Sequence, residues 1–155
     1  MTNPRLPAEY AARAKDLTPA WHRIIEGWAK NNEEMFSAAS GQSLSGMQVD
    51  ADVFWEPVTE DYFKSKSRTY PDILMVRTGL LESALTDPDN FTQVLMPDHA
   101  FFGTPTNDQA YNEALWNWEK RQVINLSEDD QALVINEIYQ YIRGIGPYVD
   151  IQGLS

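Results

Sequence analysis

The chain has no cysteine among its 155 residues. Disulfide bonds, thiolate metal sites and thiol nucleophiles are therefore excluded. Long apolar runs are also missing, because no stretch approaches the roughly 18 consecutive apolar residues that a membrane span requires. The first residues, Met1 to Pro7, lack the apolar segment of a secretory signal. We therefore expect a protein that is made in the cytoplasm and has no membrane partner.

Positive charge is scarce as well. Lys and Arg number 12 against 23 Asp and Glu, which gives a net charge of −11 and a pI near 4.4. Such a chain repels free DNA, RNA and anionic membranes, and a basic or amphiphilic partner surface suits it better. An acidic mimic of nucleic acid remains an alternative on charge alone, but the high aromatic content favours a packed scaffold.

Motifs that carry catalysis are absent from the sequence. It contains no GxGxxG, GxxxxGK[ST], GxSxG or HExxH pattern. The two histidines, His22 and His99, lie far apart, and the one helical metal-site spacing is His22 with Glu26. Structural zinc usually needs four ligands, so this pair favours a structural histidine. We expect no enzyme, no cofactor and no metal site.

The hydrophobic content of 43% suits one globular domain over residues 1–155, with a core at about 18–143. The chain ends and a loop at about 37–52, rich in Ser and Gly, are expected to be flexible.

Two long amphipathic helices are predicted near the two ends of the chain. Thr18 as N-cap with Pro19 at the first helical position predicts a helix that runs to about Ala39. Its apolar residues recur at helical spacing: Trp21, Ile24, Ile25, Trp28, Met35 and Phe36. Ser127, followed by three acids that suit the helix dipole, predicts a final helix over 128–143 that ends at Gly144.

Shorter elements fill the middle of the chain. The loosely alternating segments Phe91–Met96 and Ala100–Thr104, joined by Pro97 and Asp98, predict a β-hairpin. Short helices are expected at 8–16, at 60–66 behind Thr59, and at 79–85 behind Thr78. Residues 111–119 are left open as helix or loop, and 123–126 as strand or linker. The predicted fold class is α+β, a small antiparallel hairpin packed with several helices.

Aromatic residues are numerous, with five Trp and seven Tyr. Core packing explains most of them, but Trp116 and Trp118 cannot both face inward from a strand or from one side of a helix. Trp, Tyr and Arg anchor protein interfaces, and an unpaired hairpin edge invites pairing with a neighbour. We therefore predict a subunit interface at Phe101, Phe102, Tyr111, Trp116, Trp118 and Arg121. The acids Glu128 to Asp130 are expected to remain solvated.

The order of several segments carries a family resemblance. They are Trp21-x-x-Ile24, Trp55 to Thr59, Lys64 with Lys66, Ile73-Leu-Met-Val-Arg-Thr-Gly-Leu-Leu-Glu-Ser83, Phe102-Gly-Thr104, Tyr111, and Arg121-x-x-Ile-Asn-Leu-Ser-Glu-Asp-Asp130. In this order they cover about residues 18–143 and resemble the phage virion morphogenesis proteins, also called tail-completion proteins.

The resemblance implies a structural protein of a tailed-phage virion, made in the host cytoplasm and placed at the neck or tail terminator. Such proteins form closed rings, here a hexamer or dodecamer, that join the tail to head-completion proteins around the DNA conduit. The implied partners are copies of itself, neck proteins, and tail tube or sheath proteins, without sequence-specific nucleic acid. The alternative is a small cytoplasmic enzyme or ligand-binding domain that uses residues 111–118 as an aromatic pocket.

Overall fold

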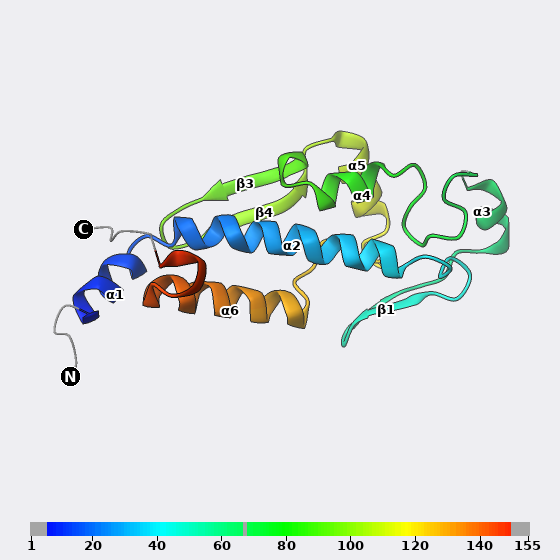
Figure 1. Cartoon of the computed structure of the whole chain (residues 1–155). Helices are drawn as coiled ribbons and strands as arrows, with labels where there is room; N and C mark the ends of the chain where they lie inside the picture. The colour runs from blue at the N-terminus through cyan, green and yellow to red at the C-terminus, as the bar shows by residue number, and fades with distance from the viewer. Residues whose placement is uncertain (1–5, 67, 150–155) are drawn as a thin grey trace.

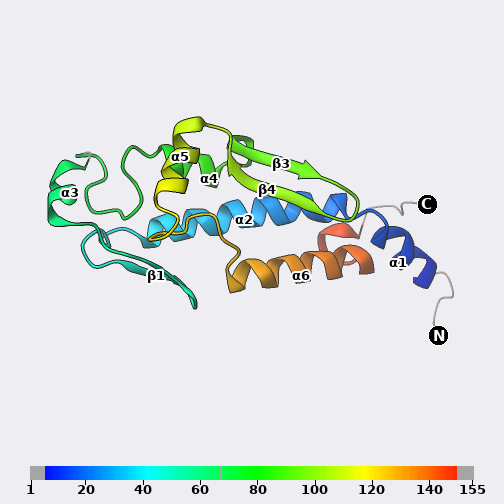
Figure 2. The same ribbon diagram turned by 180° about the vertical axis from the view of Figure 1, so that it is seen from behind.

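The structure is a computed structural model, and it describes residues 6–66 and 68–149. Helix α2 (Thr18–Ala38) runs along the middle of an elongated molecule (Figure 1). Helix α6 (Glu128–Arg143) packs on one side of α2. The hairpin of β3 (Phe91–Leu95) and β4 (Ala100–Pro105) lies on the other side, together with α4 (Leu80–Thr86) and α5 (Asp108–Trp116). The view from behind shows the same layers (Figure 2), and the predicted α+β class is confirmed.

The other elements lie toward the two ends. Helix α1 (Leu6–Ala14) and a 3-10 turn, η2 (Gly146–Tyr148), pack near the C-terminal end of α6. At the opposite end are the ribbon of β1 (Met47–Asp50) and β2 (Val53–Trp55) and the short helix α3 (Glu60–Ser65), while the 3-10 turn η1 (Pro88–Asn90) precedes β3. Each sheet has two antiparallel strands and one register shift, and Val94 lies opposite Phe101 in the β3–β4 hairpin.

Helix α2 begins at Thr18, one residue before the expected first helical residue Pro19, so Thr18 is not its N-cap. The capping position is Leu17, which makes no side-chain cap. The Asp16 carboxylate instead accepts hydrogen bonds from both the backbone N–H and the hydroxyl of Thr18. The predicted cap was wrong by one residue because the aspartate two positions earlier takes the threonine as its own partner.

The larger core lies between α2 and the hairpin layer, around Trp28. The Trp28 ring makes edge contacts with Phe91 and Phe102 at 5.2 and 5.4 Å between ring centroids. Its indole N–H donates to the carbonyl oxygen of Asn125 at 3.0 Å. A Cβ at Gly103 would lie 2.8 Å from the Trp28 ring, so only glycine fits beneath it. Trp28 thereby joins α2, the hairpin and the connection before α6.

A smaller core joins the first half of α2 to the end of α6. It consists of Ala20, Ile24, Tyr141 and Tyr148, all fully or almost fully buried. The Tyr141 hydroxyl donates to the carbonyl oxygen of Asp16 at 2.6 Å, which ties α6 to the start of α2.

The segment 37–52, expected to be flexible, is held in place over most of its length. Strand β1 lies within it, and Ala39 and Ser43 are buried. The buried Lys66 ammonium donates to the Ser43 hydroxyl at 3.0 Å and to the Ile73 carbonyl at 2.6 Å. Burial lowers the pKa of Lys66. These bonds come from residues distant in sequence, which composition does not reveal.

Thr59 is confirmed as the N-cap of α3, and Gly144 as the left-handed residue that ends α6. The predicted cap of α4 was wrong, because Gly79, with φ +82°, precedes its first residue. Residues 111–116 belong to a helix, and residues 123–126 form a connection rather than a strand.

The expected flexible tail at 144–155 is ordered in its first part, where the buried Tyr148 donates to Glu137. Residues 1–5 and 150–155, the remaining expected flexible ends, lie outside the described residues.

Replacing Ser127 by alanine is expected to destabilise the protein by about 1 kcal/mol, the usual cost of a lost N-cap. The Ser127 hydroxyl accepts from the Asp130 N–H, and the Asp130 carboxylate accepts from the Ser127 N–H, so the two residues form a reciprocal capping box. Urea unfolding measures the change. Ser37→Ala, at an exposed position in α2, is the control and should change stability by less than about 0.5 kcal/mol. Equal stability of the two variants would contradict the capping role.

Candidate functional site: an exposed aromatic surface

Helix α5 presents large apolar side chains to solvent. The Asn107 side chain caps its start by accepting from the Ala110 N–H at 3.1 Å. Its buried side holds only Ala110 and Ala114, which lets the helix lie close to α4 and β4. The exposed large residues are Tyr111, Leu115 and Trp116, and Trp116 is 77% exposed. So much uncovered aromatic surface is typical of an interaction site.

The turn after α5 holds a second tryptophan, Trp118, which is 47% exposed. Within this turn Asn117 donates to the carbonyl oxygen of Glu113 at 2.8 Å, and the Arg121 N–H donates to the Asn117 carbonyl at 2.6 Å. Hydrogen bonds on both sides of Trp118 therefore fix the backbone that carries it. Little backbone conformational entropy should therefore be lost when Trp118 binds a partner.

Arg121 was predicted to be an interface residue, and it is engaged inside the subunit instead. Its guanidinium donates to the carbonyl oxygens of Glu56 at 2.6 Å and Pro57 at 2.9 Å, and to the Asn117 side chain at 3.0 Å. Burial lowers its pKa. Arg121 thus ties the turn after α5 to the segment that follows β2. Its bonds reach about 65 residues back along the chain, and no local pattern indicates them.

The two phenylalanines of the hairpin divide between its faces. Phe101 is 66% exposed and lies opposite the half-exposed Val94 on the outer face, with the His99 ring against its edge. Phe102 faces inward and packs on Trp28. Of the six predicted interface residues, Phe101, Tyr111, Trp116 and Trp118 are therefore free to meet a partner, whereas Phe102 and Arg121 already have partners in their own subunit.

Strand β3 has a free edge that no charge protects. In the part of the chain that the structure describes, β3 pairs with β4 only. Its residues, Phe-Thr-Gln-Val-Leu, include no charged residue and no proline, and one register shift interrupts its pairing. Natural proteins usually protect such edges with lysine, proline or covering elements. The edge adds backbone donors and acceptors to the exposed side chains Val94, Met96 and Phe101.

The acids at the start of α6 differ in their surroundings. Glu128 and Asp129 are exposed as expected, but Asp130 is buried. Besides its role in the capping box, the Asp130 carboxylate accepts a hydrogen bond from Asn31 of α2 at 2.6 Å. The expectation of a solvated Asp130 was wrong because α2 packs beside this helix start.

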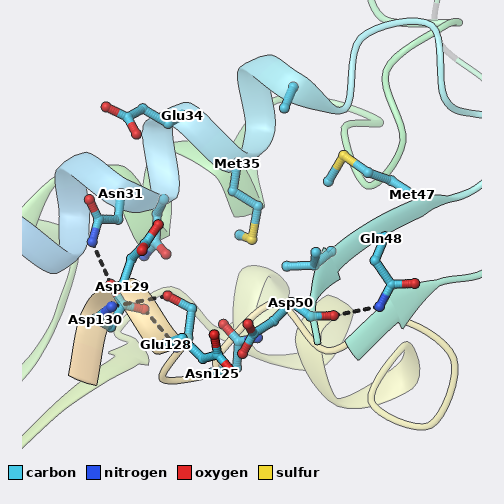
Figure 3. A pocket seen from close by; sticks show the side chains of 14 residues that line it. Asn31, Glu34, Met35, Met47, Gln48, Asp50, Asn125, Glu128, Asp129 and Asp130 are labelled. Carbon is cyan, nitrogen blue, oxygen red and sulfur yellow. Dashed lines mark hydrogen bonds between the residues drawn. The ribbon is translucent and has the colours of Figure 1, made fainter. Parts of the chain in front are cut away.

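A groove lies between α2, β1 and the start of α6 (Figure 3). Its volume is about 350 Å³. It is lined by Asn31, Asn32, Glu34, Met35, Ala38, Met47, Gln48, Val49, Asp50, Asn125, Ser127, Glu128, Asp129 and Asp130. A second, more open hollow follows the seam of α2 and α6. Residues 111–118 line neither, so the alternative of an aromatic ligand pocket gains no support from these two hollows.

Metal-ligating side chains do not gather in the described ranges. Within residues 6–66 and 68–149, no three of the His, Asp and Glu side chains are placed to hold one ion. His22 is exposed on α2.

Comparison of the chain with family models, with curated proteins and with solved structures finds no match. None of the helices in the described residues has the length and apolar character to cross a membrane.

Some of the surface could have been found from sequence. Tyr111 and Leu115 stand four apart, so one helix face carries both once α5 is accepted as a helix. Val94 and Phe101 lie on the same face of the hairpin by simple alternation. The groove could not have been found, because α2, β1 and α6 contribute to it from three distant parts of the sequence.

Proposed function

We propose that the protein is a structural component of a tailed-phage virion, a ring-forming tail-completion or neck protein. The observation that carries the proposal is the exposed aromatic surface, defined as the exposed side chains of α5, of the turn after it and of β4: Tyr111, Leu115, Trp116, Trp118 and Phe101. The uncharged free edge of β3 belongs to the same hairpin layer. The order of motifs, which resembles that of the virion morphogenesis proteins, supports the same role. This role is structural and needs no catalytic group.

Heterologous contacts between identical subunits fit this surface. The exposed aromatic surface and the β3 edge lie in the hairpin layer, whereas α6 forms the opposite layer and presents different residues. A contact that joins two different patches of identical subunits closes into a ring when the rotation between them permits. We propose a hexamer or dodecamer of this kind, with neck and tail tube or sheath proteins as neighbours.

The acidic charge suits a channel for DNA. A lumen formed by subunits of net charge −11 offers few cations to phosphates, so that the genome could slide through without specific contacts. Nucleic acid would be cargo in this role and not a ligand.

Replacing Trp116 and Trp118 together by alanine is expected to abolish tail or neck assembly while leaving a folded monomer. Both side chains are exposed, so the fold loses little, whereas truncated interface tryptophans often cost 2 kcal/mol or more each, as an order-of-magnitude figure. Infectious particles are counted after complementation of the phage lacking the gene. Circular dichroism measures the fold of the purified variant.

The control variant is Leu44→Ala, which removes an exposed large apolar side chain from the loop between α2 and β1, outside both the hairpin layer and α6. It should assemble normally. A double tryptophan variant that loses its helical signal would contradict the assignment of these residues to the surface, and the contact should then be sought on residues 54–66. The proposal as a whole fails if mass spectrometry of purified virions does not find the protein.

A further inference from the structure

The groove between α2, β1 and α6 is lined by carboxylates that form no ion pair within the described residues. Glu34 comes from α2, Asp50 from β1, and Glu128 and Asp129 from α6. None of the described residues that line the groove is Lys, Arg or His. Within residues 6–66 and 68–149, ion pairs join Arg23 with Glu137 and His99 with Asp98, and none reaches these four carboxylates. Lys30 lines the neighbouring hollow together with Glu34 and Asp129, but the lining of the groove itself keeps a net negative charge, which favours a cationic occupant.

The β1 side of the groove is a strand edge. All four consecutive residues Met47 to Asp50 line the groove. Since alternate residues of a strand point to opposite faces, a groove lined by every residue follows the edge and not one face. In the described part of the chain, β1 pairs with β2 on one side only. The Asp50 carbonyl oxygen already accepts from the Gln48 side chain (Figure 3), and the other unpaired backbone groups of β1 are available to an added strand.

The rest of the lining combines the apolar side chains of Met35 and Ala38 with polar ones, and it includes one unsatisfied group. Asn31 and Ser127 already bond to Asp130, but the side-chain nitrogen of Asn125 is buried and has no hydrogen-bond partner. A buried amide without an acceptor is costly. This nitrogen has almost no solvent-accessible surface, so a segment bound in the groove would not reach it. The strand edge and the carboxylates match two features of an extended basic peptide: its backbone N–H and C=O groups and its cationic side chains.

A lone two-stranded ribbon also benefits from a partner. The β1–β2 ribbon extends away from the body of the molecule beyond its base at Trp55, which is fully buried (Figure 1). Isolated two-stranded ribbons are marginally stable in water, and a third strand stabilises them. A second copy of this chain fits the site poorly, because each copy carries a net charge of −11.

From these observations we propose that the groove binds an extended, Lys- or Arg-bearing segment of a different protein, which adds as a strand to the edge of β1. The site is separate from the exposed aromatic surface, and the inference stands whether or not the protein forms a ring. The carboxylates select the charge of the segment, and the strand edge selects its extended conformation.

The test uses the full chain and two labelled peptides of about ten residues, one alternating Lys with Thr and the other alternating Lys with Pro. Both carry the same charge, but proline has no backbone N–H to donate to a strand edge. Fluorescence anisotropy is expected to show saturable binding of one Lys-Thr peptide per chain, with the Lys-Pro peptide about tenfold weaker, as the loss of several backbone hydrogen bonds implies. Equal binding of the two peptides would overturn strand addition.

Variants locate the binding. Neutralising Glu34, Glu128 and Asp129 as E34Q, E128Q and D129N is expected to weaken the Lys-Thr peptide about tenfold or more. The control neutralises three other exposed carboxylates, with E9Q, E26Q and E119Q, and changes the net charge equally. An equal loss in both variants would mean that the peptide follows overall charge, and would overturn the assignment to the groove. Hydrogen exchange of the wild-type protein gives an independent readout, since bound peptide should slow the amides of residues 47–50.

Discussion

Replacing Trp28 by alanine is expected to destabilise the protein by about 3–5 kcal/mol, the usual cost of truncating a buried tryptophan. The ring is 2% exposed, and it fills the space between α2, the β3–β4 hairpin and the connection before α6. Its loss leaves a cavity beside Phe91 and Phe102 and an Asn125 carbonyl without its donor. Since domains are commonly stable by only about 5–15 kcal/mol, the variant should lose a large fraction of the stability of the fold.

Urea unfolding followed by circular dichroism measures this effect. Trp116→Ala is the matched control, because it removes the same side chain from a position that is 77% exposed. It should lower the stability of the isolated chain by less than about 0.5 kcal/mol. Similar losses in the two variants would mean that Trp28 is not the centre of the core.

Gly103→Ala is expected to destabilise the protein by about 3 kcal/mol, because two costs add at this position. Its φ of +101° is one that L side chains rarely adopt. In addition, the new methyl group would lie 2.8 Å from the Trp28 ring. Gly41→Ala separates the two costs, since Gly41 has a φ of +77° but nothing within 4 Å of an added Cβ. That control variant should be destabilised by only about 1 kcal/mol, because only the backbone strain remains.

A double-mutant cycle then tests the contact between Gly103 and Trp28. Trp28→Phe removes the outer part of the indole ring, which an alanine at position 103 would meet. In that background, the cost of Gly103→Ala should fall toward the cost of Gly41→Ala, because residues in contact are not additive. If Gly103→Ala destabilises the Trp28→Phe protein as much as it destabilises the wild type, the whole loss of stability comes from the backbone conformation at residue 103.

The ends of helices could be predicted from sequence where the capping residue and its partners are close together in the chain. The caps at Thr59 and Ser127 and the end of α6 at Gly144 depend on residues within about four positions of one another. Each was confirmed at the expected residue. The cap predicted at Thr18 was wrong for a reason that is also local. The Asp16 carboxylate, two residues earlier, accepts a hydrogen bond from Thr18, and the sequence pattern for helix starts does not take that bond into account.

Features built from distant segments could not be predicted. Lys66 anchors the loop at Ser43, Arg121 anchors the segment after β2, and Asp130 meets Asn31. Alternation places Phe101 and Phe102 on opposite faces of the hairpin, but it does not say which face α2 covers. The exposed tryptophans followed from composition and helical geometry, whereas the acidic groove required the assembled fold.

The bond between the Tyr141 hydroxyl and the Asp16 carbonyl has a consequence for biosynthesis. The two residues stand 125 positions apart, so at about 5–20 residues per second a ribosome needs roughly 6–25 seconds to deliver the tyrosine after the aspartate. During that interval Ala20 and Ile24 on the nascent helix have no α6 to cover them. The first long helix made, α2, is completed by the last, α6. Translation that stops before α6 therefore leaves an aggregation-prone chain instead of a smaller domain.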